Sequence, residues 1–325
     1  MLEALSQDWN TGNHSSLISI GTHGLYISAS GQDRKPGEPI VLLMQGMGST
    51  IDEWIKVKRS VEQFARWVQY DRSGFGKSED YPSPPEKITT VMVARELDIL
   101  LTNAQIDGPF LIICHSWGGM TSREFIHLRP KEVVGIVFLD ASTETSIALS
   151  YNQPFVMAVN GNLDFIESTD ISQKHKLSDE EWKAVLTEQR RPRHQRTEGA
   201  EGNGAKEGPV SIIEKKQLER QILGNHPVSV LRANTPKDIK NMMEAGIAAG
   251  NGTEEDIKQY KELVDKWGLS DHEGQSRLLG LSSLARYSYT AENCHNVQMT
   301  DPELVVDEIK WIWAMWWSSG GSMHW

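Results

Sequence analysis

The stretch that decides the fold reads Phe110-Leu111-Ile112-Ile113-Cys114-His115-Ser116-Trp117-Gly118-Gly119-Met120. Its apolar first half is typical of a buried strand, and a helical pattern of apolar residues follows the two glycines. A serine at the sharp turn between such a strand and helix has a strained backbone and a hydroxyl raised above the sheet. The backbone N–H of Trp117, at the start of the helix, then faces whatever that hydroxyl attacks. We therefore predict that Ser116 is a nucleophile rather than a surface serine in an ordinary turn.

The composition is that of an ordinary globular protein. The 325 residues, of which 38% are hydrophobic, suffice for one large or two modest domains with a sizeable core. The formal net charge of −11 gives no electrostatic reason to bind nucleic acid or an anionic membrane. The sequence contains no run of about 18 apolar residues, so it predicts no transmembrane helix. We therefore expect neither a nucleic acid nor a membrane among the partners of this chain.

The first residues and the cysteines bear on the location of the protein in the cell. Residues 1–9 have neither the basic segment nor the long apolar segment of a secretory signal. Two cysteines in the whole sequence do not make a disulfide framework. The sequence thus predicts a cytoplasmic protein.

Apolar runs on both sides of the central stretch predict a mostly parallel sheet. Continuous runs of this kind are typical of strands that are buried on both faces. They are residues 39–44, 67–70, 133–139 and 227–231, with a short last strand at 286–289. A hairpin is expected within residues 16–30, a helix over 88–104 and a final helix that begins at Asp301-Pro302. Strands that alternate with helices predict an α/β fold.

The alternation breaks after residue 142. Residues 143–224 contain helical stretches, such as 178–189, and a polar run rich in glycine at 193–208. We expect an inserted helical cap over residues 143–224 and a core domain made of residues 1–142 and 225–325. A composition such as that of residues 193–208 does not bury itself, so we expect a mobile loop there.

These motifs together resemble the α/β-hydrolase family. The matching residues are Gln45-Gly46-Met47-Gly48, the loop 70–78, Cys114 to Gly119, and His295 followed by Asp301-Pro302-Glu303. The resemblance spans nearly the whole chain and is weakest across the cap. It implies a mostly parallel central sheet flanked by helices, with a cap over the strand ends. It also implies that the Asp71-Arg72 loop is structural and rims the pocket.

Two residues depart from the family pattern. Cys114 replaces the usual first glycine of the nucleophile turn, a change that members with another small residue tolerate. Gln45 replaces the histidine that commonly precedes the glycine of the oxyanion-binding turn, which is Gly46 in this sequence. The oxyanion donors are backbone N–H groups, so this second departure does not disable them.

His295 is the predicted general base. Of the ten histidines it is the one that lies between the last strand and a helix that begins with proline. His115, beside the nucleophile, is the alternative, but we expect its side chain to point away, into the packing between sheet and helix.

Two aspartates compete for the role of the triad acid. Many family members carry this acid in the loop after the strand that corresponds to residues 227–231, where the first carboxylate of this sequence is Asp238. Some members carry it one strand earlier, where this sequence has Asp140. We favour Asp140 because it ends a strand at the edge from which Ser116 and His295 should emerge. Asp238 stays open, as does an acid elsewhere in the chain or none at all.

The resemblance implies a serine hydrolase acting on an ester, lactone or thioester of a small organic molecule. Ser116 would form a covalent acyl-enzyme with His295 and Asp140, and the N–H groups of Met47 and Trp117 would stabilise the oxyanion. Gly46 and Gly48 would contact the substrate, and no metal or cofactor is implied. The alternatives are C–C cleavage, lyase or cyclase chemistry on a natural product, or a ligand-binding protein without catalysis.

The final helix is unusually rich in tryptophan. Trp311, Trp313, Trp316 and Trp317 all lie within it. The helical spacing of Ile309, Ile312, Trp313 and Trp316 favours core packing for part of this set. The remainder leaves a homodimer surface open.

Overall fold

The computed structural model describes residues 7–150 and 153–318. Within these ranges the strands form one sheet in the order β1-β2-β4-β3-β5-β6-β7-β8. β1 pairs with β2 and β2 with β4 in antiparallel fashion, and the other neighbours are parallel. The strands are β1 (His14–Ser19), β2 (Gly24–Gly31), β3 (Ile40–Met44), β4 (Arg66–Tyr70), β5 (Phe110–His115), β6 (Val133–Leu139), β7 (Val228–Arg232) and β8 (Ala285–Tyr289). This is the α/β-hydrolase fold that the sequence predicted.

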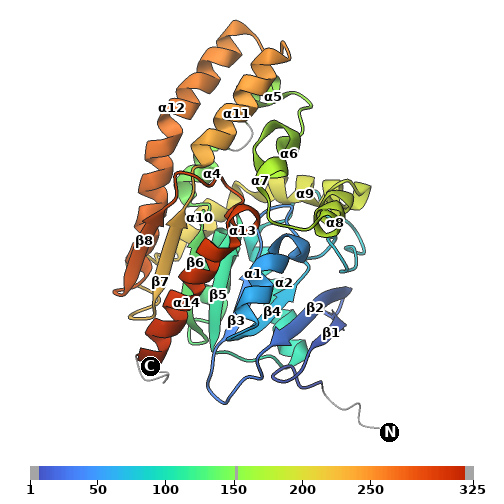
Figure 1. The fold of residues 1–325 in the computed structure, drawn as a ribbon, viewed down its shortest axis with the longest axis vertical. Coiled ribbons are helices and arrows are strands. Elements are labelled where there is room, and N and C mark those ends of the chain that lie inside the picture. The colour runs from blue at the N-terminus through green and yellow to red at the C-terminus, as the bar shows by residue number, and fades with distance from the viewer. Residues whose placement is uncertain (1–6, 151–152, 319–325) are drawn as a thin grey trace.

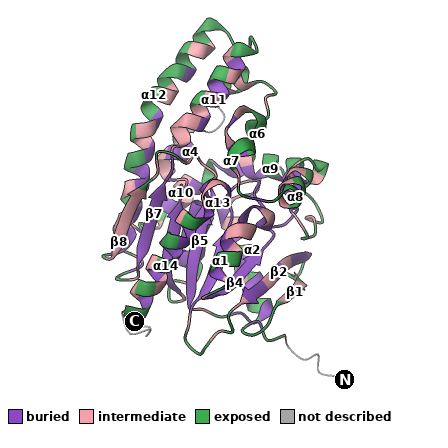
Figure 2. Ribbon diagram, in the orientation of Figure 1, coloured by how far each residue is buried: buried purple, intermediate pink, exposed green. Residues whose placement is uncertain are grey.

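Helices cover both faces of the sheet (Figure 1). On one face α2 (Thr90–Ala104) packs on α3 (Gly118–Leu128), and on the other α1 (Ile55–Val61) packs on α14 (Pro302–Ser318). Successive residues of a strand point to opposite faces, so each central strand feeds two cores. Ile112 packs in the core under α2 and α3, whereas Leu111 packs in the core under α1 and α14. Burial on both faces explains why these strands are continuous apolar runs (Figure 2).

Helices connect β6 to β7 and lie above the sheet in Figure 1. They are α4 (Glu144–Ser150), α5 (Pro154–Asn160), α6 (Phe165–Ser168), α7 (Ile171–Lys174), α8 (Asp179–Gln189), α9 (Pro192–Gly204) and α10 (Glu207–Glu214). The helical layer continues after β7, because α11 (Thr235–Ala248) and α12 (Glu254–Arg277) pack on α5. Val159, Met243 and Tyr260 form the core between these three helices. In space, therefore, the helical layer extends beyond residue 224.

Short helices complete the fold and bring loops to the sheet edge. They are η1 (Ile51–Trp54), η2 (Leu278–Leu281) and α13 (Val297–Thr300). In α14, Ile309, Ile312 and Trp316 are buried, whereas Trp317 is 48% exposed. The tryptophan-rich helix thus packs one side into the core. No helix of the described ranges is both long and apolar enough to cross a membrane.

The prediction of a mobile loop at residues 193–208 is wrong. Residues 192–204 form α9, and the chain turns directly into α10. The polar side chains of His194 and Glu201 are buried, and the Ile88 N–H donates to the Ala200 carbonyl at 2.8 Å. Gly204 serves a close approach, because a Cβ there would lie 2.1 Å from the Ile88 carbonyl oxygen. The composition indicated exposure, but partners that are distant in the sequence bury these polar groups, and composition alone does not reveal such partners.

Candidate active site

Ser116 occupies a sharp turn between β5 and α3. Its φ is +52°, in the left-handed region that side chains other than glycine rarely adopt. The turn is held by the Ser116 N–H, which donates to the Leu139 carbonyl, and by the Ser116 carbonyl, which accepts from Gly119 and Ser142. Gly118 fits because a Cβ there would lie 2.3 Å from the Met44 carbonyl oxygen. The start of α3 can therefore approach the end of β3 this closely only with a glycine at this position.

Asp140 and His295 meet at the same edge of the sheet. Asp140 follows β6, and His295 lies in the loop after β8. The distance between His295 Nδ1 and Asp140 Oδ2 is 2.6 Å. The carboxylate also accepts hydrogen bonds from the Ala233 N–H, the Gln275 amide and the Thr235 hydroxyl.

These contacts set the charges of the pair. Burial alone would raise the pKa of Asp140, but its hydrogen bond and charge interaction with His295 hold that pKa well below its usual range. Burial would lower the pKa of His295, but the hydrogen bond and charge of Asp140 raise it above its usual value. An ionised carboxylate therefore faces the imidazole ring.

Asp238 contacts the same histidine in a different way. Its Oδ2 accepts the backbone N–H of His295 at 2.9 Å. Of the two candidate acids, the structure thus brings Asp140 to the ring and Asp238 to the backbone. Both candidates lie close to His295 because the loop after β8 contacts the end of β6 through Asp140 and the start of α11 through Asp238.

The prediction that His115 points away from the site is wrong. Its Nε2 lies 2.9 Å from the His295 carbonyl oxygen, and the two ring centroids are 4.5 Å apart. The loop after β8 folds back over the end of β5, and the sequence gives no sign of this path. Burial lowers the pKa of His115 to about 3, so its ring is neutral. We infer a supporting position beneath His295.

The glycine-rich turn after β3 lies against the same cavity as Ser116. The Gly46 carbonyl accepts hydrogen bonds from Arg72 Nη2 at 2.8 Å and from the Ser49 N–H at 3.2 Å. The Gly48 N–H donates to Glu201 Oε2 at 2.9 Å, so its hydrogen bond goes to α9. Trp117 is the N-cap residue of α3, where the first N–H groups have no partner within the helix.

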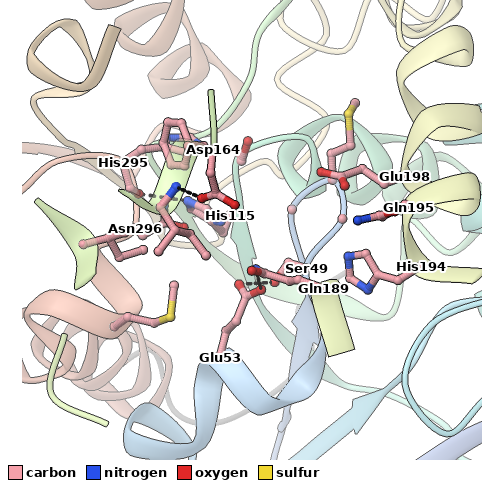
Figure 3. A pocket seen from close by; sticks show the side chains of 18 of the residues that line it. Ser49, Glu53, His115, Asp164, Gln189, His194, Gln195, Glu198, His295 and Asn296 are labelled. Carbon is pink, nitrogen blue, oxygen red and sulfur yellow. Dashed lines mark hydrogen bonds between the residues drawn. The ribbon is translucent and has the colours of Figure 1, made fainter. Parts of the chain in front are cut away.

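A cavity of about 410 Å³ extends from Ser116 and His295 to the inserted helices. Figure 3 shows His295 and His115 on one side of it and His194, Gln195 and Glu198 of α9 on the other. These residues of α9 were not predicted, because the composition of their segment indicates an exposed loop. A cavity of this size accommodates a small molecule.

Glu53 lies in the same cavity and was also missed. It accepts the Ser49 hydroxyl at 2.6 Å, and burial raises its pKa to about 7. An acidic residue within a short helix resembles an ordinary surface residue, so the sequence gives no signal for it. Among the described residues no cluster of three or more His, Cys, Asp or Glu side chains could hold a metal ion.

Comparisons with known proteins point to one family. A family model described as "alpha/beta hydrolase fold" matches residues 39–182. An "AB hydrolase superfamily protein" of Gibberella zeae is 27% identical over 298 residues, which are 89% of this chain and 90% of that protein. A thermophilic esterase from Thermogutta terrifontis has a TM-score of 0.59 at 14% identity, with 96% of this chain and 100% of that chain covered. At this identity the likeness shows the fold.

A second curated relative is a longer protein. The "Probable transporter efuK" of Hormonema carpetanum is 31% identical over 312 residues, which are 94% of this chain. The chain spans 43% of the length of that relative. The similarity therefore covers one part of the longer protein.

Proposed function

This chain belongs to the α/β-hydrolase superfamily, and we propose that within it the chain is a serine hydrolase for an ester, lactone or thioester of a small organic molecule. One observation carries the proposal. The ring of His295 contacts the buried carboxylate of Asp140 at 2.6 Å, and His295 lines the same cavity as Ser116, which occupies a left-handed turn. A nucleophile, a base and a group that orients the base are the parts that acyl transfer requires.

The reaction would proceed in two halves. Ser116 Oγ attacks the carbonyl carbon while His295 takes the hydroxyl proton, and backbone N–H groups of Met47 and Trp117 stabilise the oxyanion. Collapse of the tetrahedral intermediate breaks the bond to the leaving alcohol or thiol, which receives the proton from His295. Water then attacks the acyl-enzyme with the same base, and the acid leaves with Ser116 restored.

The test is covalent labelling of Ser116 with a fluorophosphonate probe, together with hydrolysis of a panel of p-nitrophenyl esters and lactones. We expect the Ser116→Ala variant to lose both activities while its melting temperature stays close to that of the unmodified chain. A hydroxyl at a strained turn contributes little to stability. Ser142→Ala is the control, because Ser142 is a neighbour that donates its backbone N–H to the Ser116 carbonyl.

The result separates the alternatives. Turnover that persists in Ser116→Ala would contradict the covalent mechanism. Labelling of Ser116 without any hydrolysis would favour C–C cleavage or lyase chemistry on the same residues. Absence of labelling in the unmodified chain would favour a ligand-binding protein.

A further inference from the structure

Arg72 and Glu201 form a buried ion pair between the loop after β4 and helix α9. Arg72 Nε lies 2.7 Å from Glu201 Oε1, and Arg72 Nη2 lies 3.0 Å from Glu201 Oε2. Their side chains are 3% and 1% exposed. Two parallel hydrogen bonds between a guanidinium and a carboxylate fix the geometry of both groups. Removal of one partner would leave a buried charge without compensation.

The same two side chains hold the backbone on both sides of Met47. Arg72 Nη2 donates to the Gly46 carbonyl at 2.8 Å, and Glu201 Oε2 accepts the Gly48 N–H at 2.9 Å. Gly48 has a φ of +65°. Because glycine adopts positive and negative φ about equally readily, its own conformational preference does not fix this one. The ion pair therefore clamps this segment on both sides of Met47, in addition to the hydrogen bond from the Ser49 N–H to the Gly46 carbonyl.

Peptide geometry links this clamp to the oxyanion site. The Gly46 carbonyl and the Met47 N–H belong to one trans peptide, so they point in opposite directions. A donor that is fixed on the Gly46 carbonyl therefore fixes the direction of the Met47 N–H. Rotation of this peptide would break the bonds of the Gly46 carbonyl to both Arg72 and Ser49.

We propose that Glu201, acting through Arg72, is a positioning residue of the oxyanion hole. Helix α9 holds the Gly46–Met47 peptide in the orientation in which the Met47 N–H meets the charge that develops on the substrate oxygen. The inference rests on the proposed function and adds to it. The inserted helices then determine the rate of acyl transfer as well as the choice of substrate.

A second ion pair provides a matched control. Arg123 on α3 and Glu144 on α4 also join the sheet domain to the inserted helices, with Nη1 and Oε1 2.8 Å apart and side chains 2% and 21% exposed. Arg123 Nε donates to Gln217 instead of to the glycine-rich turn. Loss of this pair tests what a buried bridge to the inserted helices contributes without contact to the oxyanion site.

The experiment compares Glu201→Ala, Glu201→Gln and Glu144→Ala with the unmodified chain, with p-nitrophenyl acetate as substrate. One misplaced oxyanion donor costs about 10²–10³-fold in kcat, and we expect Glu201→Ala to approach this loss with KM changed by no more than about threefold. Glu201→Gln keeps an acceptor for Gly48 and should recover part of the loss. Glu144→Ala should keep kcat within about threefold of the unmodified chain.

The affinity for a trifluoromethyl ketone is a second measurement, which a purely structural role of Glu201 would leave unchanged. This ketone forms a tetrahedral adduct with the nucleophile, so its affinity should fall by the same factor as kcat. Assays run well below the lowest melting temperature of the set, and Glu201→Gln carries the test if Glu201→Ala does not fold. An unchanged kcat in the Glu201 variants, or an equal loss in Glu144→Ala, would overturn the positioning role.

Failure of the proposed function would look different. The unmodified chain would then form no adduct with the trifluoromethyl ketone and would not turn over p-nitrophenyl acetate, and both proposals would fall together. An unmodified chain that forms the adduct, with Glu201 variants that bind it equally well, would overturn the positioning role alone.

Discussion

Asp140 is held from four directions, by donors of His295, Ala233, Thr235 and Gln275. Such a carboxylate cannot turn away from the ring it faces. It therefore favours the tautomer of His295 that carries its proton on Nδ1, which leaves Nε2 free to accept a proton. The role that we propose for His295 depends on this fixed partner.

Replacement of Asp140 by asparagine should remove this preference. The amide can donate to Nδ1 and so stabilises the wrong tautomer, for which losses of about 10⁴-fold in kcat are the precedent. Asp238→Asn keeps an oxygen that accepts the His295 backbone N–H, so its kcat should change little. Rates of p-nitrophenyl acetate hydrolysis by the two variants test this. A large loss in Asp238→Asn alone would assign the acid to the later loop.

The pH dependence of activity should follow the protonation of His295. The base must be neutral, and Asp140 raises its pKa in the folded protein. Activity should therefore be present at higher pH and be lost as the pH falls through this raised pKa. In Asp140→Asn the raising charge is absent, so the acid limb of the residual kcat/KM should move to lower pH. A limb that stays fixed in this variant would mean that another group controls activity.

Among the elements, β5, its turn and α3 could be predicted because their signals are local. Apolar residues buried on both faces, a serine and a glycine without room for a Cβ all lie within one short stretch. α9 could not be predicted, because its partners are distant in the sequence: Glu201 is paired with Arg72, and the Ala200 carbonyl is paired with the Ile88 N–H. The approach of Asp140 to His295 followed from the strand end. The contact of His115 with His295 depended on the path of a loop.

Two glycines of α9 give a test of this element. A Cβ added at Gly199 would have no atom within 4 Å, whereas a Cβ at Gly204 would lie 2.1 Å from the Ile88 carbonyl oxygen. Gly199→Ala should therefore stabilise the helix by about 0.5–1 kcal/mol through reduced backbone entropy. Gly204→Ala should destabilise the protein by roughly 1–3 kcal/mol, because the backbone must move. Thermal unfolding of both variants measures the two signs, and equal melting temperatures would indicate a loop.

At the scale of the whole molecule, negative charge predominates both in the chain as a whole and among the charged side chains that line the cavity. The chain has a formal net charge of −11, and the cavity is lined by the carboxyl groups of Glu53, Asp164 and Glu198. Neither lysine nor arginine lines it among the described residues. Arg72 lies close by, but Glu201 already neutralises its charge. The field at the cavity therefore disfavours anionic substrates.

This field predicts discrimination between two esters that differ only in charge. The p-nitrophenyl half-ester of terephthalic acid carries a carboxylate that cannot reach its own ester carbonyl, and its carboxamide counterpart is neutral. The pKa of Glu53 is raised to about 7 and that of Glu198 is also raised by burial, so the comparison is made at a pH above both. We expect kcat/KM to be lower for the half-ester by roughly tenfold, equivalent to about 1.4 kcal/mol.

Two controls test whether charge causes this difference in kcat/KM. Salt at about 1 M shortens the screening length to about 3 Å and should make the difference smaller. Glu198→Gln should make the difference in kcat/KM smaller at low salt as well, because one of the repelling charges is then absent. Equal or faster hydrolysis of the half-ester would contradict the proposed repulsion of anionic substrates.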